Sequence, residues 1–287
     1  MTTIVTQEDV HRAAERLGIA GTPSCVHASL RSFGWVEGGA ISVVEGLLAA
    51  RCTVLVPTFS SFNVPPPDVC AMRPPRNGWE YASVPRDESG GRRIFTPASM
   101  DLDQEDMGAV SAAVLAMRNR VRGNHPLNSF TAVGPLAHDL IDGQEPNSVY
   151  RPLEILADRD GWVLLMGVRL RSLTLLHLAE KSAGRQPFRR WANDSQGRVM
   201  MVEAGGCSRG FEKFESVLAP MERRITVGQS TWRAYPAKEA LEAAGHAILD
   251  DPFITHCGND GCRRCRDAVL GGPVFNGRLL KNSMIDA

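Results

Sequence analysis

The chain has 287 residues, and its 32 basic and 32 acidic side chains give a formal net charge of zero. This balance argues against a dedicated nucleic-acid-binding protein, which needs a basic surplus to neutralise phosphates. No apolar stretch approaches the ~18–20 residues of a membrane span, and the N-terminus lacks the basic flank and apolar core of a signal peptide. The seven cysteines, an odd number, indicate a reducing compartment. We therefore expect a globular cytoplasmic protein that binds neither nucleic acid nor membrane.

Helices and strands alternate in the first part of the chain. Thr6 followed by Asp9 resembles a capping box, and apolar residues at helical spacing follow it until Gly18. The pattern then predicts a strand over 24–29, a glycine-bearing loop over 31–39, a helix over 41–50 and a buried strand over 53–57. This βαβ-like rhythm is typical of a sheet covered by helices.

The later part of the chain continues the alternation. We expect strands over 129–134 and 162–167, helices over 107–117, 135–141, 173–183 and 236–248, and a more β-like pattern after Arg185. The sequence has no internal repeat, low-complexity tract or clear linker. It therefore predicts a single α/β domain over 1–287, a central mixed β-sheet flanked by helices, with an elaborated C-terminal part over 205–268.

Residues 61–99 interrupt this rhythm with many prolines and glycines. A loop of this length in a compact domain is either a disordered insert or a functional flap. The insertion contains four aromatic residues that could be buried: Phe62, Trp79, Tyr81 and Phe95. They favour a packed flap.

Two polar loops next to predicted strands suit an anionic ligand. The first consists of Ser29, Leu30, Arg31, Ser32, Phe33 and Gly34 and lies between a strand and a helix, where backbone N–H groups and the helix N-terminus favour phosphate. The second runs from Arg122 to Ser129. Neither contains a nucleotide-binding fingerprint. An ordinary capped loop and a solvated loop are the alternatives.

A polar stripe marks the helix that follows the buried strand 162–167. Thr174, His177 and Glu180 lie at i, i+3 and i+6, on one face of the helix. A carboxylate near an imidazole fixes its tautomer and raises its basicity, as a general base requires. Open α/β sheets also place their sites beyond the ends of such strands. The alternative is a histidine whose hydrogen bonds are satisfied within the core.

Cysteines cluster near the C-terminus. Cys262 and Cys265 form a C-x-x-C pair that follows His256 and Cys257 at zinc-ligand spacing, and Cys207 in a glycine turn could supply a distant ligand. We predict a structural zinc bound by Cys207, His256, Cys262 and Cys265, with Cys257 competing with His256 for the fourth position. Reduced thiols without metal are one alternative. A redox C-x-x-C is another, although no thioredoxin-like strand precedes it.

Taken together, these segments resemble the aminoglycoside 3-N-acetyltransferase family of antibiotic N-acetyltransferases. The resemblance covers about residues 8 to 268 and departs from the family pattern at Leu173, where the family usually has Asn. The motifs that carry it are His27-x-Ser29-Leu30-x-Ser32-x-Gly34 with Gly38-Gly39-Ala40, Val56-Pro57-Thr58-Phe59, Met107-Gly108, His125-Pro126-x-x-Ser129-Phe130-x-Ala132-x-Gly134, Leu164-Leu165-Met166-Gly167 and Thr174-x-x-His177-Leu178-Ala179-Glu180.

The resemblance implies acetyl-CoA as the donor and an amine of an aminoglycoside as the acceptor. It places the loop from Ser29 to Gly34 at the CoA pyrophosphate and pantetheine, and we assign Arg122 and Ser129 to the cofactor as well. It makes His177 the catalytic base, with Glu180 behind it and Thr174 near the thioester carbonyl. It also supports the structural zinc.

A polycationic acceptor should meet carboxylates, and acidic residues gather in and after the flap. They are Asp68, Glu80, Asp87, Glu88, Asp101, Asp103, Glu105 and Asp106. From these we predict Glu80, Asp101 and Asp103 as substrate-binding residues. A solvated acidic loop is the alternative.

Three rival functions differ in chemistry. The first is an acyltransferase that acts on a biosynthetic amine, and the second is a zinc-dependent hydrolase, which a cysteine-rich and therefore closed site disfavours. The third is a non-catalytic CoA- or metal-stabilised binding module, which the polar stripe disfavours. No cysteine neighbours His177 in sequence, so an acetyl-cysteine route has no support unless Cys25 or Cys70 comes close in space. We expect a monomer or a homodimer.

Overall fold

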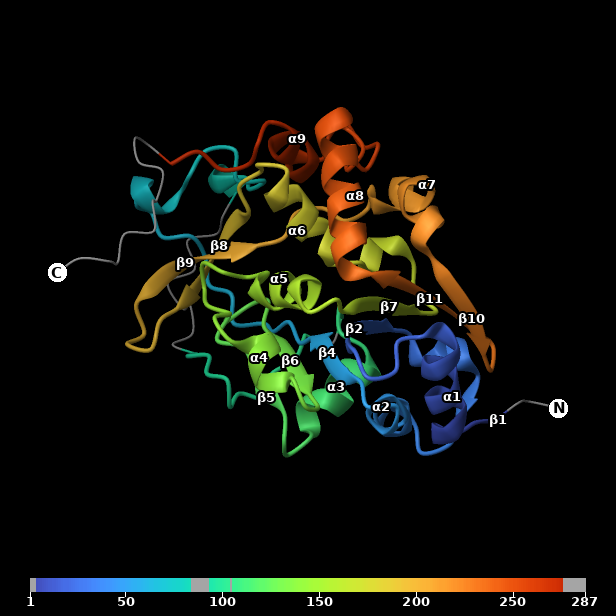
Figure 1. Ribbon diagram of the computed structural model, residues 1–287. Coiled ribbons are helices and arrows are strands. Elements are labelled where there is room, and N and C mark those ends of the chain that lie inside the picture. The colour runs from blue at the N-terminus through green and yellow to red at the C-terminus, as the bar shows by residue number, and fades with distance from the viewer. Residues whose placement is uncertain (1–3, 84–92, 104, 276–287) are drawn as a thin grey trace.

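A seven-stranded mixed sheet forms the centre of the computed structural model, which describes residues 4–83, 93–103 and 105–275 (Figure 1). The strands are β1 (Ile4–Val5), β2 (Pro23–Ala28), β3 (Trp35–Val36), β4 (Thr53–Pro57), β5 (Val121–Arg122), β6 (Phe130–Val133), β7 (Trp162–Met166), β8 (Phe188–Asn193), β9 (Val199–Ala204), β10 (Arg223–Val227) and β11 (Ser230–Pro236). The central sheet has the order β10–β11–β7–β2–β4–β6–β5. Strand β2 runs parallel to β4 and β7, whereas β6 and β11 are antiparallel to their neighbours in the centre.

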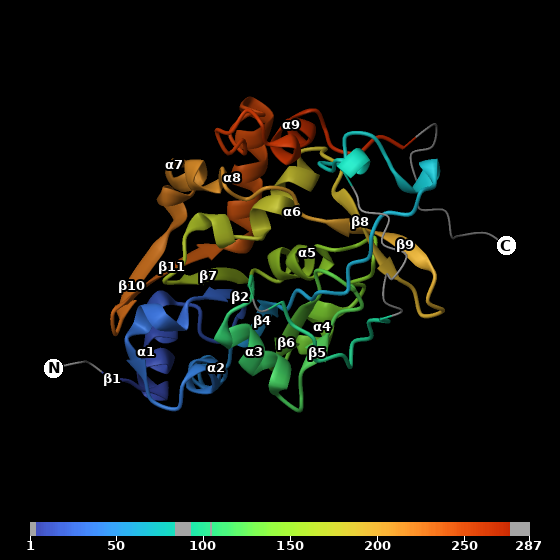
Figure 2. The same ribbon diagram turned by 180° about the vertical axis from the view of Figure 1, so that it is seen from behind.

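Helices cover both faces of this sheet. They are α1 (Gln7–Leu17), α2 (Ala40–Ala49), α3 (Ala109–Ala116), α4 (Ala137–Ile141), α5 (Arg151–Asp158), α6 (Leu175–Ser182), α7 (Glu215–Leu218), α8 (Ala237–Asp250) and α9 (Arg263–Val269). Helices α1, α2 and α3 pack on one face, and α4, α5, α6 and α8 on the other, as the front and rear views show (Figures 1 and 2). The predicted α/β fold is confirmed. Among the described residues, no helix is long and apolar enough to cross a membrane.

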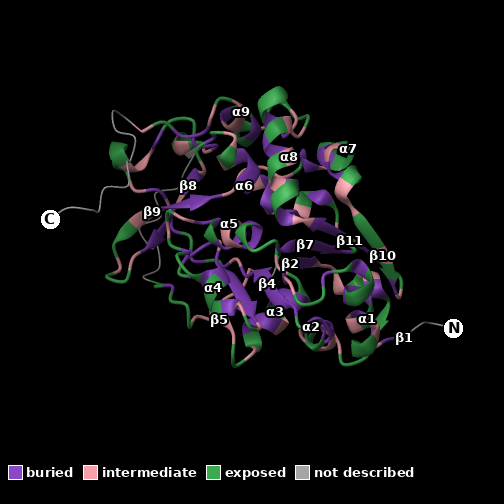
Figure 3. Cartoon of the chain, viewed as in Figure 1, coloured by how far each residue is buried: buried purple, intermediate pink, exposed green. Residues whose placement is uncertain are grey.

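Two hydrophobic cores follow from the alternation of side chains along each strand. In β7, Val163 and Leu165 face the core beneath α5, α6 and α8, and Leu164 and Met166 face the core beneath α1 and α2. All five residues of β7 are buried, as are all five of β4 (Figure 3). A strand buried on both faces is typical of the parallel centre of an α/β sheet.

Helix α1 forms as its sequence predicts. The hydroxyl of Thr6 accepts a hydrogen bond from the backbone N–H of Asp9, and the Asp9 carboxylate accepts one from the backbone N–H of Thr6. Gly18, with φ +69°, ends the helix. The two-stranded pair β1–β3 and the helices α5 and α9 were not predicted.

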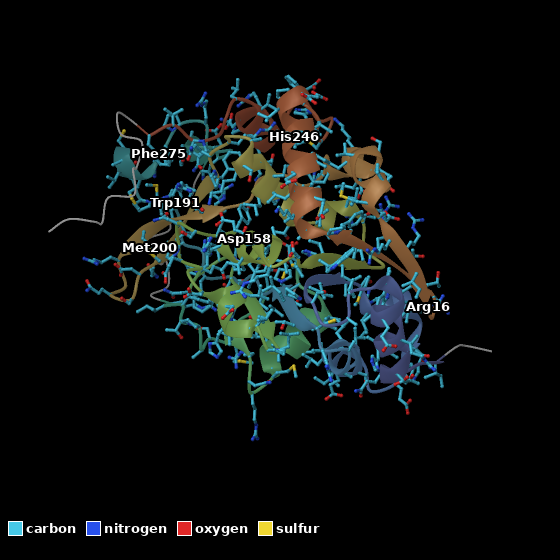
Figure 4. All side chains as sticks on the ribbon, viewed as in Figure 1. Arg16, Asp158, Trp191, Met200, His246 and Phe275 are labelled. Atoms are coloured by element: carbon cyan, nitrogen blue, oxygen red, sulfur yellow. The ribbon has the colours of Figure 1, made fainter. Side chains whose placement is uncertain are left out.

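The described parts of the flap pack on a separate β8–β9 hairpin. Trp79 and Tyr81 lie edge-on against Trp191 of β8, which Figure 4 labels, with ring centroids 5.7 and 6.0 Å away. Phe62 and Phe95 meet edge to face at 5.5 Å in a small core of their own. These contacts agree with a packed flap. Residues 84–92 lie outside the described residues.

Candidate active site

The central feature of the site is the pair of His177 and Glu180 on α6. The Nδ1 atom of His177 lies 2.8 Å from Oε2 of Glu180, and each side chain is only 12% exposed. The imidazole also stacks on Tyr150 at 6.3 Å and meets Phe211 edge-on at 4.7 Å. A carboxylate on Nδ1 holds the ring in the tautomer whose Nε2 can accept a proton. The structure thus brings the two residues of the predicted pair together.

The uncharged side chain of Tyr150 lies beside this pair. Burial, and next the charges of Glu180 and Glu203, raise the pKa of Tyr150 well above its ordinary value. The phenol therefore stays protonated at neutral pH. Gly205 lies close to both rings, because a Cβ there would lie 3.0 Å from the Tyr150 hydroxyl and 3.2 Å from Nε2 of His177.

At the end of β7 the chain passes very close to Ser32 before it continues toward α6. Gly167 follows β7 with φ +66°, and a Cβ at this position would lie 1.9 Å from Oγ of Ser32. Only glycine permits both the positive φ and the close approach. The carboxyl ends of β2, β4 and β7 meet at this edge of the sheet, where α/β proteins place their ligands. Helix α6 starts just beyond it.

A cleft of about 840 Å³ opens along this edge and includes Thr174 and His177 in its lining. Its volume is within the range of small-molecule sites, about 300–1,000 Å³. His27 at the end of β2 also lines the cleft, and burial lowers its pKa to about 4, so its ring is neutral. The lining includes Ala28, Pro57, Phe59, Ser60, Asn63, Met107, Gly108, Ser111, Leu127, Asn128, Ser172, Cys207 and Ser208.

The predicted donor loop from Ser29 to Gly34 lies next to this cleft rather than in its lining. Its preceding residue, Ala28, lines the cleft, and the backbone N–H of Ser29 donates to the Met166 carbonyl. Residues Leu30–Phe33 form a short 3₁₀ helix. Oγ of Ser32 donates to the Ser29 carbonyl and lies 2.8 Å from Oγ of Ser230. Arg31 is exposed.

Phe33 corrects one part of that prediction. Its side chain is fully buried and packs edge-on against Trp232 at 5.7 Å. It belongs to the core beneath α1 and α2, and its ring has no access to a cofactor.

Arg122 and Ser129 also differ from the prediction that they contact the cofactor. Ser129 is fully buried and Arg122 is 4% exposed. The guanidinium donates to Oγ of Ser129 and to the carbonyls of Thr58, Ser99 and Asp101. Burial lowers the pKa of Arg122 to about 10, which leaves it charged at neutral pH. This loop is polar because it carries an internal hydrogen-bond network, and neither side chain lines the cleft.

The predicted substrate carboxylates separate into two groups. Asp103 lines the cleft, and so do Glu105 and Asp106, which were not among the predicted substrate-binding residues. Asp101 instead accepts from the backbone of Ser61 and pairs with Arg93, and Glu80 pairs with Arg263. Arg93, within the same acidic stretch, and Arg263, near the C-terminus, thus engage these two carboxylates, and neither Glu80 nor Asp101 is among the residues that line the cleft. Asp87 and Glu88 lie outside the described residues.

Four arginines in the cleft were missed by the sequence analysis. Arg171, Arg190, Arg209 and Arg264 come from separate parts of the chain, and only the fold brings them to one cavity. The Arg190 guanidinium lies 4.9 Å from the centre of the Trp79 ring, and burial lowers its pKa to about 10. The cleft thus presents both carboxylates and guanidinium groups to a ligand.

Four cysteines gather at one point near the C-terminus. The sulfur atoms of Cys207, Cys257, Cys262 and Cys265 all lie within 4.8 Å of one another. His256 is not part of this cysteine cluster, since its Nδ1 accepts the backbone N–H of Gly258 at 3.1 Å. Cys257 thus takes the place that the prediction gave to His256. Adjacent side chains point in different directions, so Cys257 joins the cluster and His256 does not.

The sheet, the helices on both its faces and the His–Glu pair in a cleft at the strand ends are features of an α/β enzyme. The family of this enzyme follows from its sequence. A profile described as aminoglycoside 3-N-acetyltransferase matches residues 25–248, and the chain belongs to that family.

Two curated relatives agree with this assignment. The chain is 35% identical over 186 residues to aminoglycoside N(3)-acetyltransferase VIII of Streptomyces fradiae, an alignment that spans 62% of each chain. It is 31% identical to aminoglycoside N(3)-acetyltransferase IX of Micromonospora chalcea, over 95% of this chain and 91% of that one.

Among solved structures, the fold matches apo aminoglycoside acetyltransferase AAC(3)-IVa with a TM-score of 0.75 and 24% identity, over 94% of this chain and 99% of that chain. It matches AAC-IIIb in binary complex with CoASH with a TM-score of 0.68 and 20% identity, over 86% and 97%.

Proposed function

We propose that this protein transfers the acetyl group of acetyl-CoA to an amine of an aminoglycoside, in the cytoplasm where acetyl-CoA is available. The observation that carries the proposal is the His177–Glu180 pair, held at 2.8 Å beside a cleft large enough for both substrates' reacting ends. The names of the relatives supply the acceptor class, and the CoA complex of AAC-IIIb supplies the donor class.

The proposed transfer is direct. A substrate ammonium must lose a proton before its nitrogen can attack the thioester carbonyl, and Nε2 of His177 takes that proton. Glu180 compensates the positive charge that develops on the imidazole, a form of general base catalysis that contributes about 10²–10⁴-fold. Attack forms the new C–N bond and a tetrahedral intermediate, and collapse of this intermediate breaks the C–S bond and releases CoA as the thiolate. The nitrogen loses its second proton, which protonates the thiolate, and His177 returns the first proton to solvent.

Thr174 is the proposed partner of the tetrahedral oxyanion. It lies one turn before His177 on the cleft side of α6, and its hydroxyl makes no cap hydrogen bond to the helix. A hydroxyl in this position can donate to the oxygen of the former thioester carbonyl.

Charge distribution suggests how the two substrates share the cleft. The carboxylates of Asp103, Glu105 and Asp106 suit the ammonium groups of the acceptor. The guanidinium groups of the cleft and the neighbouring loop from Ser29 to Gly34 suit the phosphates and pantetheine of CoA. A related acyltransferase that acts on a biosynthetic amine is the second candidate, because the same cleft charges would serve it.

The test of this function is CoA release measured with a thiol reagent. The protein is incubated with acetyl-CoA and a panel of aminoglycosides and simple biosynthetic amines. Release that depends on an aminoglycoside supports the proposal, and release only with other amines selects the second candidate. Hydrolysis of acetyl-CoA without any acceptor, dependent on zinc, would select a hydrolase instead.

We further propose that the cysteine cluster binds a structural zinc ion. Zinc–sulfur bonds of about 2.3 Å in a tetrahedron place the sulfur atoms about 3.8 Å apart. The observed set, all within 4.8 Å, fits this arrangement. Four thiolates close the coordination shell and leave no position for substrate, so the ion would fasten the segments around Cys207 and Cys265 to each other.

Metal analysis of protein purified without a histidine tag tests the zinc site. We expect about one zinc per chain, its loss in Cys262→Ser and its retention in the matched variant Cys70→Ser, since Cys70 is exposed and outside the cluster. Chelation should lower the melting temperature before it lowers activity. A zinc content near zero, with all four cluster thiols reactive in the native protein, contradicts the site.

A further inference from the structure

The residue behind the His–Glu pair is an arginine that neither the motifs nor the cleft lining single out. Arg185 is 8% exposed, and its Nη1 donates to Oε1 of Glu180 at 2.8 Å. The two oxygens of Glu180 are thus divided, with Oε2 on His177 and Oε1 on Arg185. A carboxylate held at both oxygens cannot rotate away from the imidazole without losing a charge-assisted hydrogen bond.

The end of α6 places Arg185 there. The backbone N–H of Gly184 donates to Lys181, and that of Arg185 donates to Glu180, the two bonds of a Schellman motif. Gly184 has φ +90°, a conformation that glycine adopts without strain. This turn folds the chain back over the last turn of the helix, so that the side chain of Arg185 reaches Glu180.

The far side of the Arg185 guanidinium is fixed by a distant segment. Nη1 also donates to Oγ1 of Thr255 at 2.7 Å, and Nη2 donates to the Pro252 carbonyl at 2.6 Å. Thr255 is 3% exposed and follows α8, two residues before Cys257 of the cysteine cluster. The guanidinium therefore connects α6 to the C-terminal segment that lies beside it (Figure 1).

We propose that Arg185 is a positioning residue for the transfer reaction: it fixes the orientation of Glu180 and, through Glu180, the ring of His177. This inference rests on the proposed function of the pair. Arg185 contacts Glu180 and is not among the residues that line the cleft, so its effect should appear in the catalytic step. Lysine can restore the charge beside Glu180 but cannot form the fork that reaches Thr255 and Pro252 together.

Steady-state kinetics of Arg185 variants test the proposal. We expect Arg185→Met to lower kcat by about 10- to 100-fold, the usual cost of losing a residue that orients a catalytic histidine through its partner, while the KM values for both substrates change less. Arg185→Lys should recover part of kcat, and Thr255→Val should lower it by a smaller factor. A folded Arg185→Met enzyme with wild-type kcat overturns the proposal.

A matched arginine separates positioning from general stability. Arg233 of β11 is also a partly buried arginine, and it pairs with Glu215 and Glu222 rather than with the His–Glu pair. Arg233→Met should lower the melting temperature without lowering kcat. If Arg185→Met does not fold, Arg185→Lys and Thr255→Val remain informative, and wild-type kcat in both overturns the proposal.

Two further measurements complete the test. In a double-mutant cycle, Glu180→Gln combined with Arg185→Met should lose no more activity than Glu180→Gln alone, because both act through one contact. Fully additive losses contradict the proposal.

If wild-type protein transfers no acetyl group to any amine, the proposed function has failed, but positioning remains measurable by NMR. The Nδ1 proton of His177 should give a downfield signal in wild type that Arg185→Met loses, and an unchanged signal overturns the positioning role.

Discussion

Helices α1 and α6 each carry a histidine and a glutamate at helical spacing, and of these two only α6 lies at the cleft. On α1, His11 lies 3.7 Å from Glu8 and 3.5 Å from Glu15, and its side chain is 30% exposed. On α6, His177 lies 2.8 Å from Glu180, and both are 12% exposed. The spacing is nearly the same. Burial and contact geometry make the difference.

The surroundings of each pair explain that difference. The glutamates of α1 point into solvent, where an ion pair contributes about 0–1 kcal/mol and does not fix a ring. On α6, the imidazole lies between Tyr150 and Phe211, and Glu180 is held from behind by Arg185. A histidine next to a glutamate on a helix is therefore weak support for catalysis until rigid neighbours are found around it.

The threonines that immediately precede the two helices also differ in their contacts. Thr6 uses its hydroxyl to cap α1 in a reciprocal capping box. Thr174 precedes α6 in a helical conformation and makes no cap hydrogen bond, so its hydroxyl remains available on the cleft side. The Thr6 hydroxyl therefore stabilises its helix, whereas the Thr174 hydroxyl lies on the cleft side without a cap hydrogen bond.

The largest expected effect is that of removing the base. His177→Ala should lower kcat by about 10²–10⁴-fold with little change in affinity for acetyl-CoA, because a base acts in the transition state. The matched variant His11→Ala should keep wild-type kcat. Steady-state kinetics with CoA titrations measure both. Near-wild-type turnover in folded His177→Ala, or an equal loss in His11→Ala, would remove the distinction between the helices.

A smaller effect is expected from the threonine at the start of α6. Thr174→Val keeps the shape of the side chain and removes the hydroxyl, so kcat should fall by about 10²–10³-fold if this group stabilises the oxyanion. The melting temperature should change little, because the hydroxyl makes no cap hydrogen bond. Kinetics and thermal unfolding of the same preparation measure the two quantities. A stability loss with unchanged kcat would make Thr174 a structural residue like Thr6.

The body of the fold was predictable because its elements carry local signals. The strand over 53–57 coincides with β4, and α1 has both its cap and its final glycine where the sequence predicts them. Helix α5 was missed although Pro152 stands in its first turn and its buried residues follow helical spacing. Helix α9 was missed because it is short, and four of its seven residues are charged.

The site was predictable only in part, because several of its contacts join distant segments. The pair on α6 lies within one turn of helix, so spacing was sufficient to find it. The partners of Glu80 and Arg122 were not predictable, because Arg263 and the backbone carbonyls of Ser99 and Thr58 reach them only in the folded chain. Arg185 had a local signal, the glycine at the end of α6, but its role depends on Thr255 seventy residues later.

The smallest expected effect concerns the cap of α1. Thr6→Ala removes the hydroxyl that accepts from the Asp9 N–H and donates to its carboxylate, which should cost about 1 kcal/mol of stability, or about 2–4 °C in melting temperature.

Hydrogen bonds from Thr6 hold the pKa of Asp9 below its ordinary value of 3.8. The contribution of that carboxylate is therefore present above pH 3.8 and is lost as the pH falls through the lowered pKa. Thermal unfolding of wild type and variant should differ by a constant amount near neutral pH and by a smaller amount in acid, where only the hydrogen bond from the Asp9 N–H to the Thr6 hydroxyl still separates them, with kcat unchanged at neutral pH. A difference of undiminished size at low pH would mean that the cap acts without the Asp9 charge, and a fall in kcat would mean that α1 is coupled to the cleft after all.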